Sequence, residues 1–184
     1  MILHRAKYNG FGMKQIEGTL QVFNEFFKKE KFDTVIEIGT VPGGFALFLA
    51  DKSKEFGFRF ITIDIREPNK KILLLIRKSN GFFVNEDALH SNIIIKNLYM
   101  QNNRVLILND GGLKEPIFAK YIGMLKRNDF LLTHDYYPWI NETVDKDSGG
   151  ISMLTVKDLI DKFNIEVKYE KLFDKFLWLC CRKR

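Results

Sequence analysis

Apolar residues along the chain fall into two alternating patterns. Short, nearly continuous apolar runs predict buried strands over residues 32–38, 58–65, 81–87, 103–110 and 129–137. Segments whose apolar residues recur every three or four positions predict helices over residues 12–30, 43–56, 68–79, 91–100, 115–126 and 151–163. Five strand–helix units in succession indicate an α/β fold, in which helices cover both faces of a parallel sheet.

The C-terminal end departs from this alternation. Residues 165–173 and 175–183 predict two further strands with no helix between them, so we expect these strands to pair as an antiparallel hairpin. The sheet would then be seven-stranded and mostly parallel. No repeat or linker is visible in the sequence, which predicts a single domain over residues 1–184 with an N-terminal helical extension over residues 1–30.

The composition indicates the broad class of protein and its net charge. Of the 184 residues, 46% are hydrophobic and 28% are charged, which is typical of a soluble globular protein. No apolar run approaches the length of a transmembrane helix, so no membrane insertion is expected. Cys180 and Cys181 would point to opposite faces of a strand, which disfavours a bridge between them and favours a reduced, cytoplasmic protein. The net charge of +6 permits a nucleic-acid partner without requiring one.

The first predicted strand ends in a glycine-rich loop. In the stretch EIGTVPGGFALFLA, the loop residues Glu37, Gly39, Thr40, Gly43 and Gly44 stand between a strand and a helix. Open α/β sheets bind ligands at the carboxyl ends of their strands, and glycines let a ligand approach the backbone, so the loop predicts a nucleotide-like cofactor. A carboxylate or a phosphate would suit the helix start equally well. The G-x-G-x-x-G spacing of dinucleotide sites is absent.

Acidic residues follow the next two predicted strands. Asp64 can accept hydrogen bonds from both hydroxyls of a ribose, and the neighbouring Ile65 is assigned to the same cofactor site. Asp87 can accept a hydrogen bond from an adenine amino group, while the backbone amide of Ala88 donates to the ring. The alternatives are that Asp64 only faces water at a strand end and that Asp87 caps a helix.

Candidate chemistry follows the fourth and fifth predicted strands. Asp110, His134 and Asp135 would lie at one edge of the sheet, where they can hold Mg²⁺ or, with the imidazole as a ligand, a softer divalent cation. Such a cation would activate the hydroxyl of an acceptor, and Lys114 can assist as a base. We therefore assign catalysis to all four residues and metal binding to Asp110, His134 and Asp135. The alternative for Asp110 is to position the cofactor without a metal.

The segments VIEIGTVPGGFALFLA, ITIDIR, LILNDGGLK and FLLTHDYY resemble the class I S-adenosylmethionine-dependent methyltransferases. The similarity is to the cephalosporin hydroxylase-like branch with its small-molecule O-methyltransferases, and it runs from about residue 10 to the C-terminus. It implies a Rossmann-like fold, S-adenosyl-L-methionine as cofactor, and a metal at Asp110, His134 and Asp135. The sequence departs from the branch at Leu113, where a polar residue commonly follows the acid, and at His134, where many relatives have an acid.

Residues 136–150 form a longer connection than is typical of such folds. We expect a substrate lid, in which Tyr136, Tyr137 and Trp139 line an acceptor pocket; the alternative is that these rings only cover the edge of the sheet. The expected function is metal-assisted O-methylation of a saccharide or another small hydroxyl acceptor. Two other functions stay open: a nucleic-acid methyltransferase, suggested by the isoelectric point of about 9.2, and a scaffold that binds the cofactor without turnover.

Overall fold

The computed structural model describes residues 5–139 and 149–184. At its centre is a seven-stranded sheet with the strand order β5-β4-β3-β6-β7-β9-β8. The strands are β3 (Thr34–Ile38), β4 (Arg59–Asp64), β5 (Gly81–Asn85), β6 (Val105–Asn109), β7 (Phe130–His134), β8 (Ile165–Val167) and β9 (Trp178–Lys183). The first five of these pair in parallel, and β9 is antiparallel to both of its neighbours. The predicted mostly parallel sheet with a C-terminal antiparallel hairpin is confirmed.

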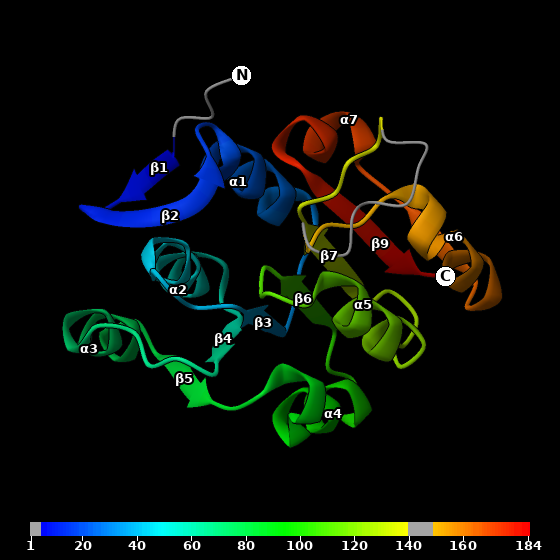
Figure 1. The fold of residues 1–184 in the computed structure, drawn as a ribbon. Helices are drawn as coiled ribbons and strands as arrows, with labels where there is room; N and C mark the ends of the chain where they lie inside the picture. The colour runs from blue at the N-terminus through cyan, green and yellow to red at the C-terminus, as the bar shows by residue number, and fades with distance from the viewer. Residues whose placement is uncertain (1–4, 140–148) are drawn as a thin grey trace.

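Helices cover the sheet on both sides (Figure 1). One face carries α1 (Thr19–Lys29), α2 (Gly44–Phe56), α3 (Lys70–Lys78) and α7 (Glu170–Phe173). The other face carries α4 (Asn92–Tyr99), α5 (Lys114–Ile122) and α6 (Met153–Lys162). Two short 3₁₀ turns, η1 (Ala88–His90) and η3 (Asp174–Phe176), lie in the connections after β5 and α7.

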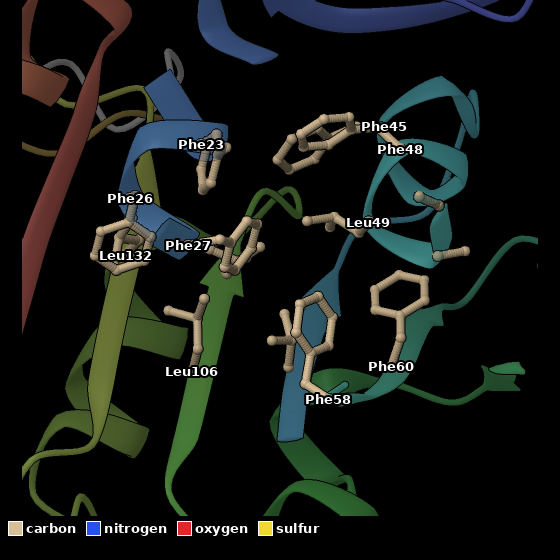
Figure 2. Close-up of a cluster of buried hydrophobic side chains, with 14 of the residues drawn as sticks. Phe23, Phe26, Phe27, Phe45, Phe48, Leu49, Phe58, Phe60, Leu106 and Leu132 are labelled. Atoms are coloured by element: carbon tan, nitrogen blue, oxygen red, sulfur yellow. The ribbon is translucent and has the colours of Figure 1, made fainter. Parts of the chain in front are cut away.

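The core consists of two layers, because successive residues of a strand point to opposite faces of the sheet. In β6, Leu106 and Leu108 join the cluster on one face and Ile107 joins the cluster on the other. The first cluster is rich in phenylalanine: Figure 2 shows side chains of α1 and α2 meeting over the sheet, where Leu106 and Leu132 form part of the floor. Phe23 and Phe26, which are fully buried, pack edge to face at 6.5 Å between ring centroids. Phe26 also packs edge to face on Phe130 of β7, at 5.6 Å between ring centroids, which holds α1 against the sheet.

The N-terminal segment corrects the expected helical extension. Strands β1 (Arg5–Tyr8) and β2 (Phe11–Ile16) form an antiparallel hairpin, and the helix begins only at Thr19, after Gly18 with a φ of 93°. The prediction of a helix from residue 12 is wrong because burial in β2 alternates with a period of two: Met13 and Gln15 are buried and the residue between them is exposed. The hairpin packs on α2.

The C-terminal hairpin also differs in its connection. The predicted strand over residues 165–173 ends at Val167, and the helical turns α7 and η3 fill the connection that was expected to lack a helix. Phe173 of α7 is fully buried against Phe23 and Phe26, with ring centroids 5.3 Å from each. This aromatic contact explains why the chain turns back toward α1 before it forms β9.

Over the described ranges, 5–139 and 149–184, no helix combines the length and apolar character that crossing a membrane requires.

Gly44 offers a test of how the hairpin is seated. A Cβ atom at this position would lie 2.6 Å from the carbonyl oxygen of Gly12 and 2.7 Å from that of Phe11, both in the backbone of β2. We expect Gly44→Ala to lower the free energy of unfolding by about 1–3 kcal/mol, because the overpacked hairpin must shift. The matched control is Gly112→Ala, where a Cβ would meet no atom within 4 Å. Urea denaturation compares the two, and equal midpoints would contradict the predicted seating.

Candidate active site

A cavity of about 880 Å³ opens at the carboxyl ends of the parallel strands. It brings together most of the residues that the sequence singled out: Gly39, Asp64, Ile65, Asp87, Ala88, Asp110, Lys114, His134, Asp135 and Tyr137. The parallel register explains the grouping, since Ile38 pairs with both Ile63 and Asn109, and Asn109 pairs with Thr133. The residues that follow these positions therefore emerge side by side at one edge.

Six candidate residues do not line the cavity, namely Glu37, Thr40, Gly43, Gly44, Tyr136 and Trp139. Tyr136 is buried in the core cluster beside α5 and α6, so its expected contact with an acceptor is replaced by packing. Trp139 is 63% exposed and contacts the ring of Tyr137, at 6.1 Å between centroids. Residues 140–148 of the expected lid lie outside the described residues.

The three glycines of the first loop have different roles. Gly39 lines the cavity with a φ of 100°, and a Cβ there would lie 2.8 Å from the backbone of Asp110. A Cβ at Gly43 would lie 2.6 Å from the side chain of Ile72, and Gly44 faces the backbone of β2. Gly43 and Gly44 thus make room for helix and hairpin packing, and their predicted contact with a cofactor stays a prediction. Of the three, Gly39 lines the cavity.

Asp64 is a nearly buried carboxylate in the cavity wall. Its Oδ2 accepts a hydrogen bond from the backbone N–H of Val41 at 3.0 Å, and its Oδ1 accepts from that of Arg66 at 2.9 Å. These bonds hold the glycine loop against the end of β4. Two carboxylate oxygens can accept about four hydrogen bonds, so Asp64 retains capacity for hydroxyl donors. Ile65 beside it is 70% exposed, which places a large apolar side chain at the cavity rim.

Asp87 caps the turn η1, as the structural alternative predicted. Its carboxylate accepts a hydrogen bond from the backbone N–H of Leu89 at 2.9 Å, and the other oxygen lies 3.0 Å from Nδ1 of His90. The hydrogen bond from Leu89 and then the contact with His90 hold the pKa of Asp87 below its ordinary value. Tyr121 donates its hydroxyl proton to the carbonyl of Ala88, which secures the same turn. Both Asp87 and Ala88 are therefore fixed at the cavity wall.

Glu37 is fully buried behind the glycine loop. Its Oε2 accepts a hydrogen bond from the Thr62 hydroxyl at 2.5 Å, and that hydroxyl lies 2.6 Å from the hydroxyl of Thr40. Burial raises the pKa of Glu37 well above its ordinary value, and the nearby charges of Asp110 and Asp64 act in the same direction. Its Oε1 has no hydrogen-bond partner among residues 5–139 and 149–184. Glu37 and Thr40 thus support the loop from inside the fold.

Four ionisable side chains meet where β6 and β7 end. Nδ1 of His134 lies 3.0 Å from Oδ1 of Asp110 and 3.3 Å from Oδ1 of Asp135. The Lys114 ammonium lies 3.7 Å from Oδ1 of Asp110 and 3.3 Å from Oδ2 of Asp135. Asp135 has a φ of 57°, an uncommon value for a non-glycine residue, and the resulting bend turns its carboxylate toward the preceding imidazole. The predicted catalytic residues therefore form one contact network.

Gln15 is a member of this network that the sequence did not reveal. Its side-chain amide donates a hydrogen bond to Oδ2 of Asp110 at 2.7 Å and accepts one from the indole N–H of Trp178 at 3.0 Å. The Trp178 ring in turn lies 4.9 Å from the imidazole of His134. Gln15 belongs to β2, so the N-terminal hairpin supplies a wall of the site. The alternating burial of residues 13–16 was the available signal, and the helical prediction concealed it.

The donor atoms of this network do not fit a metal ion as they are arranged. Both oxygens of Asp110 contact a side-chain nitrogen, on Gln15 for Oδ2 and on His134 for Oδ1, and both oxygens of Asp135 contact His134 or Lys114. Within the part of the chain that the structure describes, no group of three or more His, Cys, Asp or Glu residues could hold a metal ion. The metal site stays a prediction, and no step of the chemistry below depends on it.

Replacing Gln15 tests whether the hairpin supports the site. We expect Gln15→Ala to lower the free energy of unfolding by about 1–3 kcal/mol, because it leaves a buried carboxylate oxygen and an indole N–H without their partner. Chemical denaturation measures the loss. Lys14→Ala, at the exposed neighbouring position, is the control and should change stability little. A loss no larger than that of the control would contradict the role assigned to Gln15.

Glu37 predicts a pH dependence. The folded chain keeps a proton on Glu37 that the unfolded chain releases near 4.5, so the free energy of unfolding should fall as the pH rises above this value. The contribution is at most about 1.4 kcal/mol per pH unit until the raised pKa is reached. Glu37→Gln should flatten this decline when unfolding is measured from about pH 5 to pH 8. Glu17→Gln, at an exposed position, is the control, and parallel curves for all three proteins would refute the assignment.

Comparison with known proteins gives information on the fold. No family model matches the sequence, and no curated protein matches it. Among solved structures, CmcI-D160 with Mg and SAM is similar with a TM-score of 0.66 and 14% identity, over 97% of this chain and 76% of that chain.

Two further structures agree with that similarity. The SAH-bound methyltransferase PaMTH1 of Podospora anserina has a TM-score of 0.57 and 17% identity, over 91% of this chain and 78% of that chain. The Burkholderia thailandensis 1,6-didemethyltoxoflavin-N1-methyltransferase has a TM-score of 0.57 and 13% identity, over 90% of this chain and 77% of that chain. At such identities the likeness is one of fold. The fold of this chain is therefore that of the class I methyltransferases, as its sequence resemblance predicted.

Proposed function

We propose that this chain binds S-adenosyl-L-methionine and transfers a methyl group to a hydroxyl of a small acceptor, for which a saccharide is our leading candidate. The observation that carries the proposal is that one cavity spans the carboxyl ends of five neighbouring strands. Asp64 and Ala88 line it beyond β4 and β5, and the network around Asp110 and His134 lines it beyond β6 and β7. The first group suits a nucleoside and the second suits proton transfer.

The cavity residues fit the proposed cofactor. Gly39 lines the cavity, and its lack of a side chain lets the loop lie against the backbone of Asp110, which a Cβ would meet at 2.8 Å. Asp64 would accept hydrogen bonds from the ribose hydroxyls, while the exposed side chain of Ile65 would cover the adenine. Asp87 and the amide of Ala88 would contact the edge of the same ring. When bound, S-adenosyl-L-methionine supplies an electrophilic methyl group on its sulfonium sulfur.

His134 supplies the base. Nδ1 of His134 faces two carboxylate oxygens, which assigns a proton to Nδ1 and leaves the lone pair on Nε2. Nε2 is buried and has no hydrogen-bond partner among the described residues, and in our proposal the acceptor hydroxyl becomes that partner and gives its proton to Nε2. Asp110 and Asp135 then stabilise the imidazolium that forms. With the cofactor bound, the acceptor oxygen would gain the methyl group as its proton moves to Nε2 of His134, and the electrons of the broken sulfur–carbon bond would remain on sulfur.

One observation favours a second acceptor class. Lys14 and Arg66 are exposed cations that line the cavity mouth, and the chain carries a net charge of +6. Phosphate groups of a nucleic acid would be attracted to such a mouth. RNA binding that falls steeply with added salt, together with methylation of the RNA, would favour this class over a small acceptor. Cofactor binding without turnover on any acceptor would favour the scaffold alternative.

Calorimetry and a methyl-transfer screen test the proposal. We expect binding of S-adenosyl-L-methionine and of its demethylated product, and methyl transfer to at least one sugar or phenol in a screen that also contains RNA. Asp64→Ala should weaken cofactor binding by roughly 1.5–3 kcal/mol for each charge-assisted hydrogen bond lost. Asp161→Ala, on the exposed surface of α6, is the control. Binding of NAD with no response to S-adenosyl-L-methionine would overturn the proposal.

A further inference from the structure

We propose that the Lys114 ammonium is the cation of this site and stands in place of a divalent metal ion. One consequence, that methyl transfer by this chain needs no metal, rests on the proposed function. The position of Lys114 between the two carboxylates is a property of the folded chain and does not depend on the reaction. Its test can therefore fail or succeed separately from any test of turnover.

Lys114 is held among acceptor oxygens on several sides. Its Nζ lies 3.3 Å from Oδ2 of Asp135 and 3.7 Å from Oδ1 of Asp110, and it donates a hydrogen bond to the carbonyl of Gly111. The side chain is only 3% exposed. A buried ammonium is unfavourable unless it is paired, and here two carboxylates pair with it. The ammonium of Lys114 in turn balances the charge of Asp110 and Asp135.

The position of Lys114 in its helix supports this reading. Lys114 is the first residue of α5, and the N-terminal end of a helix favours anions and disfavours cations. Helix formation therefore gives no reason for a buried lysine at this position. The backbone is pinned nonetheless, because the side-chain amide of Asn109 donates a hydrogen bond to the carbonyl of Lys114 at 2.9 Å. The contact with the two carboxylates accounts for the placement.

A metal ion would compete with Lys114 for the same oxygens. An ion bound to Asp110 and Asp135 would lie close to the ammonium, and the repulsion between like charges in this buried setting would oppose binding. Oδ2 of Asp110 is also occupied by the amide of Gln15. In the proposed reaction, the Lys114 ammonium stabilises the negative charge that develops on the acceptor oxygen as His134 takes the proton.

The experiment measures Mn²⁺ binding by electron paramagnetic resonance, with neither cofactor nor acceptor present. The wild-type protein should hold no more Mn²⁺ than the Asp110→Asn variant. Lys114→Met removes the internal cation, and this variant should bind Mn²⁺ at least about tenfold more tightly than the wild type. Its melting temperature should fall in EDTA and recover with Mg²⁺. Lys157→Met removes an exposed lysine that pairs with Asp161, and this matched control should show none of these effects.

Stoichiometric Mn²⁺ binding by the wild type that Asp110→Asn abolishes would overturn the proposal. Methyl transfer that stops in EDTA and returns with Mg²⁺ would do the same. If Lys114→Met does not fold, the wild-type and Asp110→Asn measurements still decide the question. Failure of methyl transfer on every acceptor would remove the proposed function, while the Mn²⁺ result would continue to support or refute the role of Lys114.

Discussion

Burial on both faces of the central strands is the constraint on which this molecule depends. All residues of β3, β6 and β7 are buried, so most of their side chains are apolar. Ionisable groups then gather where the strands end. The parallel register places Gly39, Asp64, Asp110 and His134 in one row at that edge, since the residues just before them are paired directly or through a shared neighbour. The site is a consequence of this register.

Burial also requires that charges at this edge be compensated. Asp110 is contacted by Gln15, Lys114 and His134, which come from β2, α5 and β7 respectively. A buried charge without a partner is costly. The N-terminal hairpin and the C-terminal strand that carries Trp178 therefore both stabilise the contact network around Asp110. Gln15 thereby links the N-terminal hairpin to the C-terminal strand β9.

The glycines of the first loop have different surroundings. Gly43 and Gly44 admit Ile72 and the backbone of β2, whereas Gly39 alone faces the cavity. The same division applies to the aromatic residues after β7, where Tyr136 enters the core and Tyr137 lines the cavity. Neighbouring residues of one motif thus serve different purposes, because the chain direction changes sharply at the strand ends and turns successive side chains to different surroundings.

The sequence by itself determined the strand–helix alternation, the mostly parallel sheet and the strand ends at which Asp64, Asp110 and His134 stand, because apolar periodicity and chain order control these features locally. It could not determine that residues 11–16 form a strand, that Gly43 and Gly44 serve packing, or that Tyr136 is buried, since each depends on a surface brought up from elsewhere in the chain. The hydrogen bond between Gln15 and Asp110 joins residues 95 positions apart. Only the tertiary structure decided it, because a contact of that kind requires the hairpin to be packed before the two side chains can meet.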